Sequence, residues 1–575
     1  MDERFKALVR HFWGAFFDVE IVHPTAESKL GIGHILAVLA VPGFMMSFGL
    51  FRKYVQISVA IWQRRIPAIR WDMAIWSDEL FFLTYAAAFM GFVTVFQWET
   101  LFLNKRDWMV FGAMPLRMRT ILGAKAVSLM IYLGVFAATI NGVAMVTFPA
   151  AVDKPEAAST TAVSFALHYI VSVVAMCIFV FFFMIALQGL LMNLLPGKLF
   201  RRVSPVAQFF CLMSMLSMLL LFPGISSLLR PLEENYTPWL FAFPPMWFIG
   251  WIELSRGRTE PVFADLAAVA WPAFWSVIAI AVAMYLLSYY RHVKRSLEAA
   301  SDIESDPSWF ERALWRAANR LFLNDQTERA VFHFALKTAL RSRRHWLILS
   351  AYAGVGFSIA LNALLIMLNR KGYAAVQEVS AGLLSMPLIL TFLLLIGLRF
   401  IFTIPAELRA NWVFRMTQSA DQLRYLWAIR KVMLVMVAFP VLAPILPLHG
   451  VLWDWGISLH HFLFCLALTW LLMEVLLLRF QKIPFTCSYL PGKANLPYFG
   501  GLYVAGFLTY VTSMSQLEYS LLMKRWWAIW VFYGVMTIAI VYLARYRHQL
   551  LREEGNEFTF DDPPELAVTT LNLAG

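Results

Sequence analysis

The chain has 575 residues, of which 60% are hydrophobic and 15% are charged. This balance is too apolar for a soluble globular protein of this size and predicts a membrane protein. A net charge of +12 would suggest nucleic-acid binding in a soluble protein. In a membrane protein we expect basic residues to meet lipid headgroups or a cytoplasmic partner, and we assign no nucleic-acid role.

The N-terminal segment 3–17 has the pattern of an amphipathic helix. Phe5, Leu8 and Phe12 recur at helical spacing, whereas Arg4 falls on another face. Such helices lie in the plane of the membrane interface. The pattern leaves two roles open, a lipid anchor alone or a helix that also couples to the membrane spans.

The hydrophobic stretches predict an all-α polytopic membrane protein with twelve transmembrane helices. The hydrocarbon core of a bilayer is about 30 Å thick and needs about 20 apolar residues in a helix. The stretches lack the alternation of a membrane β-barrel, and the N-terminal segment has no cleavage site, so the first span is expected to stay as an anchor. The spans are placed at 32–51, 79–97, 121–149, 162–195, 205–228, 264–290, 346–368, 379–402, 428–447, 458–479, 499–516 and 525–544.

An even number of spans places both termini on one side of the membrane. Most of the 48 Lys and Arg residues fall in segments assigned to that side. The positive-inside rule therefore predicts that both termini are cytoplasmic. The loop 52–78, which this orientation places outside, carries several basic residues and runs against the rule.

The segment 98–120 after the second span has a counterpart at 403–427 after the eighth. The sequence DWMVF in the first aligns with NWVF in the second once one residue is omitted. In both segments an acidic residue precedes the motif and a lysine opens the next span. The acidic residues are Glu99 and Glu407, and the lysines that open the next spans are Lys125 and Lys431.

The tetrapeptide LPGK also occurs twice, between spans four and five and between spans ten and eleven. Neither copy is a phosphate loop, because the outer glycine and the magnesium-binding hydroxyl are missing. Proline and glycine suit a tight turn, with the glycine free to adopt the left-handed conformation. The equivalent positions support an internal repeat, with an ordinary positively flanked hairpin as the alternative. The residues are Pro196, Gly197, Lys198, Pro491, Gly492 and Lys493.

The polar stretch 291–345 divides the chain into two sets of six spans and contains a second amphipathic pattern. We expect a first half at 1–290, a second half at 346–545 and a cytoplasmic tail at 546–575. Each half has an even number of spans, so the halves form a parallel repeat. They diverge outside the membrane, where the loop 229–262 is long and aromatic and its counterpart is short.

Catalytic and metal-binding motifs are not recognisable in the sequence. HExxH, GxSxG and a Gly-rich dinucleotide turn are missing, so we expect no enzyme activity and no cofactor in this chain. The four cysteines form no CxxC pair. We expect His460 and His461 to lack nearby acidic or cysteine ligands, and hence no metal site and no disulfide framework.

Polar side chains inside predicted spans are costly and suggest a role in function or packing. Asn141, Gln188 and Asn362 are neutral, and we expect them mainly to bond across helices. Glu474 lies near the cytoplasmic end of span ten. Its role is left open between pairing with a basic residue at a neighbouring helix end and a place on a transport path.

Several segments resemble the permeases of bacterial type 2 ATP-binding-cassette exporters. The similar segments are LFFLTYAAAFMGFVTVFQWETLFLNKRDWMVFGAMPLRMRTILGAK, FPPMWFIGWIE and KIPFTCSYLPGKANL. The first has an aromatic-acidic pair followed by RDW, a proline and a lysine. The resemblance implies an inner-membrane permease with two six-span halves, whose cytoplasmic loops dock on a separate ATPase that binds ATP and Mg²⁺.

The resemblance also assigns roles to residues. The loop after the second span of each half would be a coupling helix, the LPGK segments a second contact, and the long outer loop a set of short helices over the exit. The coupling residues would be Glu99, Arg106, Asp107, Trp108 and Pro115 in the first half and Glu407, Arg409, Asn411 and Trp412 in the second. The second set lacks an equivalent of Pro115, so the two surfaces are expected to differ.

The leading hypothesis is therefore a permease that exports a hydrophobic or amphiphilic substrate and is driven by ATP hydrolysis on a partner subunit. An ion-gradient-driven secondary transporter also uses parallel halves and is the first alternative. A non-transporting membrane component of a similar assembly is the second.

Overall fold

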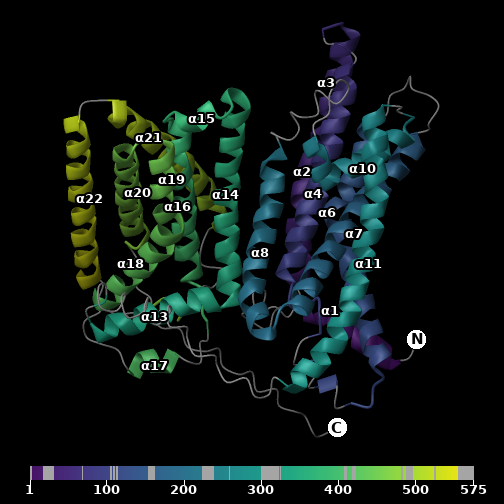
Figure 1. The fold of residues 1–575 in the computed structure, drawn as a ribbon, viewed down its shortest axis with the longest axis horizontal. Helices are drawn as coiled ribbons and strands as arrows, with labels where there is room; N and C mark the ends of the chain where they lie inside the picture. Colours follow the sequence, from purple (N-terminus) through teal and green to yellow (C-terminus); the bar gives the residue numbers. More distant parts are fainter. Residues whose placement is uncertain are drawn as a thin grey trace. The chain divides into compact units, whose positions relative to one another are not determined.

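The computed structural model describes residues 3–16, 31–65, 67, 69–103, 107, 110–111, 114–152, 162–222, 238–257, 260–298, 323, 325–406, 411–416, 423–478, 480, 483–486, 496–523 and 526–553. The regular secondary structure of these residues is helical throughout (Figure 1). The chain divides into two compact units, Met1–Ile303 and Glu304–Gly575, here called unit 1 and unit 2. The division falls within the predicted linker 291–345.

Unit 1 consists of long helices with a few short ones between them. Its helices are α1 (Glu3–Ala15), α2 (Gly31–Phe48), α3 (Leu50–Trp62), α4 (Ile69–Phe96), α6 (Met118–Val152), α7 (Ala162–Leu194), α8 (Gly197–Leu220), the 3₁₀ turn η2 (Pro238–Ala242), α10 (Pro244–Ser255) and α11 (Pro261–Glu298).

Unit 2 has a similar make-up. Its helices are α13 (Gln326–Arg341), α14 (Arg343–Lys371), α15 (Ala374–Gln377), α16 (Ala381–Ile401), α17 (Asn411–Met416), α18 (Leu423–Val437), the π-helical turn η5 (Ala438–Leu442), α19 (Ala443–Leu452), α20 (Trp455–Leu476), α21 (Leu496–Met523) and α22 (Trp526–Glu553). The turn η5 contains Pro440, whose missing N–H interrupts the α-helical hydrogen bonds.

Ten helical segments within the described residues are long and apolar enough to cross a membrane. In hydrocarbon a helix satisfies its backbone hydrogen bonds internally, which is why such segments are helical. The chain is thus a multi-pass, all-α membrane protein. The predicted spans 32–51 and 499–516 fall on α2 and α21, which are not among the ten. The predicted number of twelve spans is therefore not confirmed, and the internal repeat remains a prediction.

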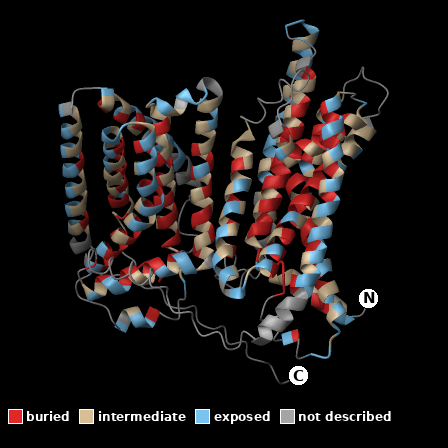
Figure 2. Ribbon diagram, in the orientation of Figure 1, coloured by how far each residue is buried: buried red, intermediate tan, exposed pale blue. Residues whose placement is uncertain are grey.

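The long helices differ greatly in how much of their surface is buried (Figure 2). In the apolar 18-residue stretch of α4, 78% of the residues are buried, whereas in that of α22 only 6% are buried. Trp530, Ile538 and Tyr542 of α22 are exposed large hydrophobic side chains. Such a surface requires an apolar solvent, so α22 faces lipid while α4 forms the centre of unit 1.

The helices around the second predicted span extend further than hydropathy suggested. The span was expected from residue 79, after a loop at 52–78, but α4 begins at Ile69 and α3 occupies much of that loop. Asp78 accepts hydrogen bonds from Lys53 Nζ at 2.6 Å and from the Tyr54 hydroxyl at 2.8 Å. These polar contacts hold α3 on the first turns of α4. The charged residues in this part of the sequence prevent it from being recognised as a membrane span.

The predicted outer loop 229–262 contains the short helix α10, which is buried rather than spread over the surface. Its residues Met246, Phe248 and Ile252 are fully buried. It packs on α7 and α11. A Cβ atom added to Gly250 would lie 2.7 Å from the Leu266 Cβ and 2.7 Å from the Phe263 carbonyl oxygen. The glycine therefore allows α10 and α11 to approach closely.

Gly250→Ala should lower the stability of unit 1, because the added methyl meets backbone atoms that cannot move away cheaply. Overpacking of this kind costs about 1–3 kcal/mol. The measurement is the thermal unfolding midpoint of the purified chain in detergent. Gly134→Ala in α6 is the matched control, because its added Cβ would meet nothing within 4 Å. Equal midpoints for the two variants would contradict the packing of α10 on α11.

Candidate docking surfaces and buried polar clusters

The end of α4 in unit 1 is fixed by hydrogen bonds to two other helices. Trp98 Nε1 donates to Ser204 Oγ of α8 at 3.0 Å, and Gln188 Nε2 of α7 donates to the Trp98 carbonyl oxygen at 2.7 Å. Trp98, Ser204 and Gln188 are all buried. Glu99, the next residue, is exposed. This predicted docking residue therefore lies on a segment that buried contacts hold in place.

The amphipathic helix α1 packs on the loop after α4 and on the start of α6. Phe12 is fully buried in an apolar cluster with Phe111 and Ile121. Gln97 Nε2 donates to the Phe16 carbonyl oxygen at 2.8 Å. The apolar side of α1 thus contacts protein, which favours the coupling role over that of a lipid anchor alone.

Lys125 at the start of α6 lies beneath this helix. Its Nζ is 4.9 Å from the ring centroids of both Phe12 and Phe16, and the residue is almost fully buried. An ammonium group over aromatic faces gains cation–π stabilisation when it is desolvated. Asp107 contributes a favourable charge interaction with Lys125 and lies 4.0 Å from His11 Nε2 of α1.

The remaining predicted coupling residues of unit 1 are in part outside the described structure. Pro115 is exposed on the loop between α4 and α6. Arg106 and Trp108 lie outside the described residues. The structure thus places Glu99, Asp107 and Pro115 on the loop that α1 supports.

In unit 2 the short helix α17 occupies the position predicted for the second coupling element. Figure 1 shows it beyond α13, outside the bundle of long helices of this unit. Its buried residue Asn411 donates through Nδ2 to the Thr486 carbonyl oxygen, and the Phe414 ring lies 4.8 Å from that of Phe334 on α13. These two contacts fix one side of α17.

The other side of α17 is apolar and exposed. Trp412 is 61% exposed and Met416 is 79% exposed, with Val413 beside them also exposed. Large apolar side chains that are held in place outside the membrane helices are typical of a protein contact surface. Glu407 and Arg409, which were predicted to act with Trp412, lie outside the described residues.

The chain before α17 is held by a second segment from far along the sequence. The Phe485 carbonyl oxygen accepts a hydrogen bond from the Ala406 N–H at 2.9 Å. The Phe485 N–H donates a hydrogen bond to the Phe402 carbonyl oxygen at 3.1 Å. His345 Nε2 lies 2.9 Å from the Ile404 carbonyl oxygen. Phe485 has a positive φ of 67°, an unfavourable conformation for a bulky residue, which these contacts enforce.

The helix α13 is joined to α18 by two ion pairs. Arg424 Nη1 lies 2.7 Å from Asp325 Oδ1, and Lys431 Nζ lies 2.5 Å from Glu328 Oε1. The Arg424 hydrogen bond holds the pKa of Asp325 below its usual range. Asp325 also caps α13 by accepting from the Thr327 N–H. The cap therefore stays charged and in place until the pH falls through this lowered pKa.

The first LPGK copy lies at the short connection between α7, which ends at Leu194, and α8, which begins at Gly197. Pro196 precedes α8 with φ −58° and ψ 149°, and Gly197 is the first residue of the helix. The glycines with positive φ in the described part of the chain are Gly257 and Gly372. The left-handed conformation that glycine permits is not used here, because an extended proline followed directly by a helix already reverses the chain. The Lys198 side chain and the residues Pro491, Gly492 and Lys493 lie outside the described structure.

Two of the predicted intramembrane amides bond to other elements. Asn141 Nδ2 of α6 lies 3.3 Å from Cys177 Sγ of α7, and Gln188 holds the end of α4 as described above. Asn362 of α14 is half-buried, and its Oδ1 has no hydrogen-bond partner within the described residues. The packing role is thus visible for two of these amides but not for Asn362.

Glu474 is paired with two arginines in the structure. Its Oε2 lies 2.6 Å from Arg430 Nη2 of α18 and 3.2 Å from Arg547 Nη1 of α22. All three side chains are buried. Of the two roles that the sequence left open for Glu474, the structure shows the pairing with basic residues, one in the middle of α18 and one in the last turns of α22.

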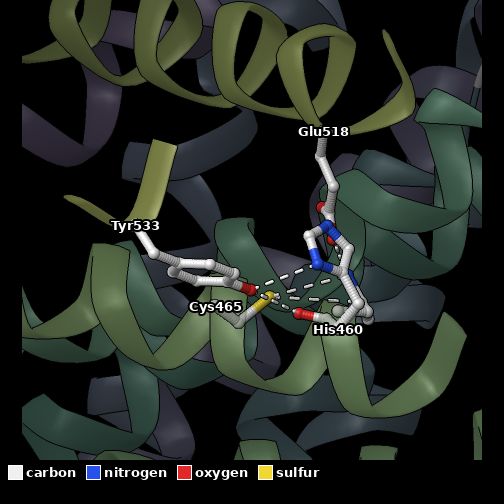
Figure 3. A network of polar contacts seen from close by, with 5 residues as sticks. His460, Cys465, Glu518 and Tyr533 are labelled. Atoms are coloured by element: carbon white, nitrogen blue, oxygen red, sulfur yellow. Dashed lines mark hydrogen bonds and ion pairs between the residues drawn. The ribbon is translucent and has the colours of Figure 1, made fainter. Parts of the chain in front are cut away.

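A further buried acid, which the sequence analysis missed, lies beside His461. Figure 3 shows the cluster that Glu518 of α21, Tyr533 of α22 and three residues of α20 form. Glu518 Oε1 lies 2.7 Å from His461 Nδ1, and both side chains are fully buried. The Cys465 sulfur lies 3.8 Å from the same nitrogen, and the Tyr533 hydroxyl lies 3.2 Å from His460 Nδ1.

This cluster corrects the expectation that His460 and His461 lack acidic or cysteine neighbours. Cys465 is one helical turn away in the sequence, whereas Glu518 comes from a different helix and could not be found by sequence proximity. Within the described residues, no group of three His, Cys, Asp or Glu side chains is arranged to hold a metal ion. The cluster is instead a histidine–carboxyl pair that can take up or release a proton.

Unit 1 also contains a buried acidic pair that the sequence analysis missed. Glu79 of α4 and Glu253 of α10 are fully buried. Arg256 donates through Nη1 to Glu253 Oε1 at 2.7 Å. Glu253 and Arg256 are also the strongest charged neighbours of Glu79. One guanidinium therefore serves two carboxyl groups.

Comparison of the chain with protein-family models, with curated proteins and with solved structures found no match.

The Trp98–Ser204 bond can be tested by a double-mutant cycle. Trp98→Phe and Ser204→Ala should each lower stability by about 1 kcal/mol, because a typical buried hydrogen bond contributes about that much. The double variant should be about as stable as the less stable single variant, within a few tenths of a kcal/mol. The free energy of unfolding in mixed detergent is the measurement. Additive effects would show that the two side chains do not interact.

Proposed function

We propose that this chain is the membrane-spanning permease component of an ATP-driven exporter of the ATP-binding-cassette type. Its substrate would be hydrophobic or amphiphilic, and ATP and Mg²⁺ would bind on a separate ATPase subunit. The chain itself carries no phosphate-loop motif. The resemblance of its segments to type 2 permeases and the arrangement of its helices support this proposal.

The observation that carries the proposal is the exposed apolar side of α17. Trp412, Val413 and Met416 are exposed together on a six-residue helix whose other side is fixed by Asn411 and Phe414. Aromatic side chains of this kind supply much of the binding energy in protein interfaces. Because α17 is already held in place, a partner would bind it without first ordering this helix.

The amphipathic helices that pack on the two loops explain how a docked ATPase could act on the membrane helices. In each unit an amphipathic helix packs both on the loop and on the next long helix, α1 on α6 and α13 on α18. A displacement of the loop would therefore move the ends of these long helices rather than be absorbed locally. Binding and hydrolysis of ATP on the partner would in this way bias the equilibrium between conformations of the permease.

Replacing Trp412 by alanine should weaken the ATPase complex by about thirtyfold or more, because truncating a central interface aromatic costs about 2 kcal/mol or more. The full-length chain is purified from its native membranes in mild detergent, the copurified ATPase is identified by mass spectrometry, and its ATP hydrolysis is measured. Trp530→Ala on the lipid-facing helix α22 is the control, since Trp530 is equally exposed but remote from α17 in this unit. Absence of an ATPase with the unaltered chain, or equal recovery with Trp412→Ala, would refute the proposal.

The pair of Glu518 and His461 favours one second candidate, a proton-coupled secondary transporter. Buried carboxyl groups within membrane helices commonly mark proton and ion pathways. Glu474 is less suited to this role, since it is held by two arginines. Glu518 has only a histidine as its ion-pair partner in the described residues, and the imidazole can itself gain or lose a proton.

Glu518→Gln should abolish transport driven by a pH gradient in proteoliposomes if this second candidate is correct, because the amide cannot release a proton. Uptake of a fluorescent amphiphilic dye with and without the gradient is the measurement. Glu378→Gln, on an exposed residue of the same unit, is the control and should leave transport intact. Unchanged gradient-driven transport by Glu518→Gln would exclude this role for the pair.

A further inference from the structure

Three helices of unit 2 bring two arginines and one glutamate together. Arg430 lies in the middle of α18, Glu474 lies near the end of α20, and Arg547 lies in the last turns of α22. Arg430 is 3% exposed, and Glu474 and Arg547 are each 1% exposed. Arg547 is exceptional on α22, because most of the apolar surface of that helix is open to its surroundings.

The positive charge of this cluster is not balanced. Two guanidinium groups face one carboxylate, and both contact the same oxygen, Glu474 Oε2. Even if Glu474 is fully ionised, the cluster carries one excess positive charge. Within the described residues, Glu474 is the one acidic residue that pairs with Arg430 and Arg547.

The hydrogen-bond donors are not satisfied either. All three nitrogens of the Arg547 guanidinium are buried and make no hydrogen bond within the described residues, and Nη1 is 3.2 Å from Glu474 without hydrogen-bond geometry. The Arg430 Nε is also buried without a partner. A buried guanidinium with unmet donors is strongly unfavourable, because the lost hydration has not been replaced.

We propose that Arg547 and Arg430 form a binding site for a phosphate-type oxyanion at this end of unit 2. An oxyanion would neutralise the excess charge and accept the hydrogen bonds that Arg547 and the Arg430 Nε do not otherwise make. The planar fork of an arginine matches phosphate oxygens in a bidentate manner. The site rests on these contacts alone and does not depend on the proposed function.

The surroundings of the site suit a ligand that comes from the membrane surface. The Arg430 guanidinium carbon lies 4.6 Å from the ring of Trp427, which is partly exposed and would line the approach. Tryptophans and arginines at helix ends are typical of the depth at which lipid headgroups lie. A phospholipid headgroup and free inorganic phosphate offer the same chemistry, and the experiment separates them.

The experiment measures binding of two probes to the full-length chain. One probe is inorganic phosphate, added to the detergent-solubilised protein and followed by the thermal unfolding midpoint. The other is phosphatidylglycerol in nanodiscs of phosphatidylcholine, with retained lipid counted by native mass spectrometry. Arg547→Gln should weaken binding of the effective probe by about tenfold or more, since charge-assisted hydrogen bonds contribute about 1.5–3 kcal/mol. Arg545→Gln, on an exposed arginine two residues away on α22, should bind as the unaltered chain does.

Binding of phosphatidylglycerol alone would identify a headgroup site, and binding of inorganic phosphate would identify a site for the free anion. Binding of neither probe by the unaltered chain would overturn the proposal. So would equal binding by Arg547→Gln and Arg545→Gln. If Arg547→Gln fails to fold, Arg547→Lys replaces it, because lysine keeps the charge but loses the bidentate fork and should still bind several-fold more weakly.

Glu474→Gln provides a test in the opposite direction. The carboxylate competes with the ligand for both arginines, so its neutral replacement should tighten oxyanion binding several-fold. A purely structural triad would predict no such gain, and only a loss of stability. Unchanged or weaker binding by a folded Glu474→Gln variant would therefore contradict the site.

Discussion

The packing of an amphipathic helix against the loop that follows a long membrane helix determines what each unit can present to a partner. In unit 1, α1 covers Lys125 with Phe12 and Phe16. In unit 2, α13 holds α17 through Phe334 and Phe414. A loop at the membrane surface without such support has only water and headgroups to contact, and it would pay an ordering cost on binding. Because the same two helices also pack on α6 and α18, the loops are joined mechanically to the spans, as the proposed function would require.

The buried acids show how differently this chain balances charge inside helices. Glu518 is paired with a histidine, whose own charge can change. Glu253 accepts a hydrogen bond from Arg256, which is also a charged neighbour of Glu79. Around Glu474 there are two arginines for one acid. Since an uncompensated charge is costly where water is excluded, the excess of arginines around Glu474 is what the proposed anion would balance.

Hydropathy predicts the existence of most long helices here, because backbone hydrogen bonding in hydrocarbon leaves little choice of structure. It does less well at their ends. The start of α4 at Ile69 was missed because Asp72 and Asp78 interrupt the apolar pattern, although the helix continues through them. The proposed docking segments were predicted from matched motifs. The contacts that fix them were not, since Trp98 and Ser204 are 106 residues apart and the helix packing that joins them leaves no local trace in the sequence. Glu518 and His461 were missed for the same reason, with 57 residues between them.

Under the proposed function, the two docking loops would present different side chains to an ATPase. The loop of unit 1 exposes Glu99 and Pro115 together with the apolar residues Val110 and Met114. Charged groups at the rim of an interface mainly speed association and are screened by salt. The α17 surface of unit 2 exposes Trp412 and Met416, which favour a long-lived apolar contact. Two identical ATPase subunits would therefore meet two different surfaces. The proposed assembly is therefore asymmetric even if both ATPase subunits are the same, because the asymmetry is built into this single chain.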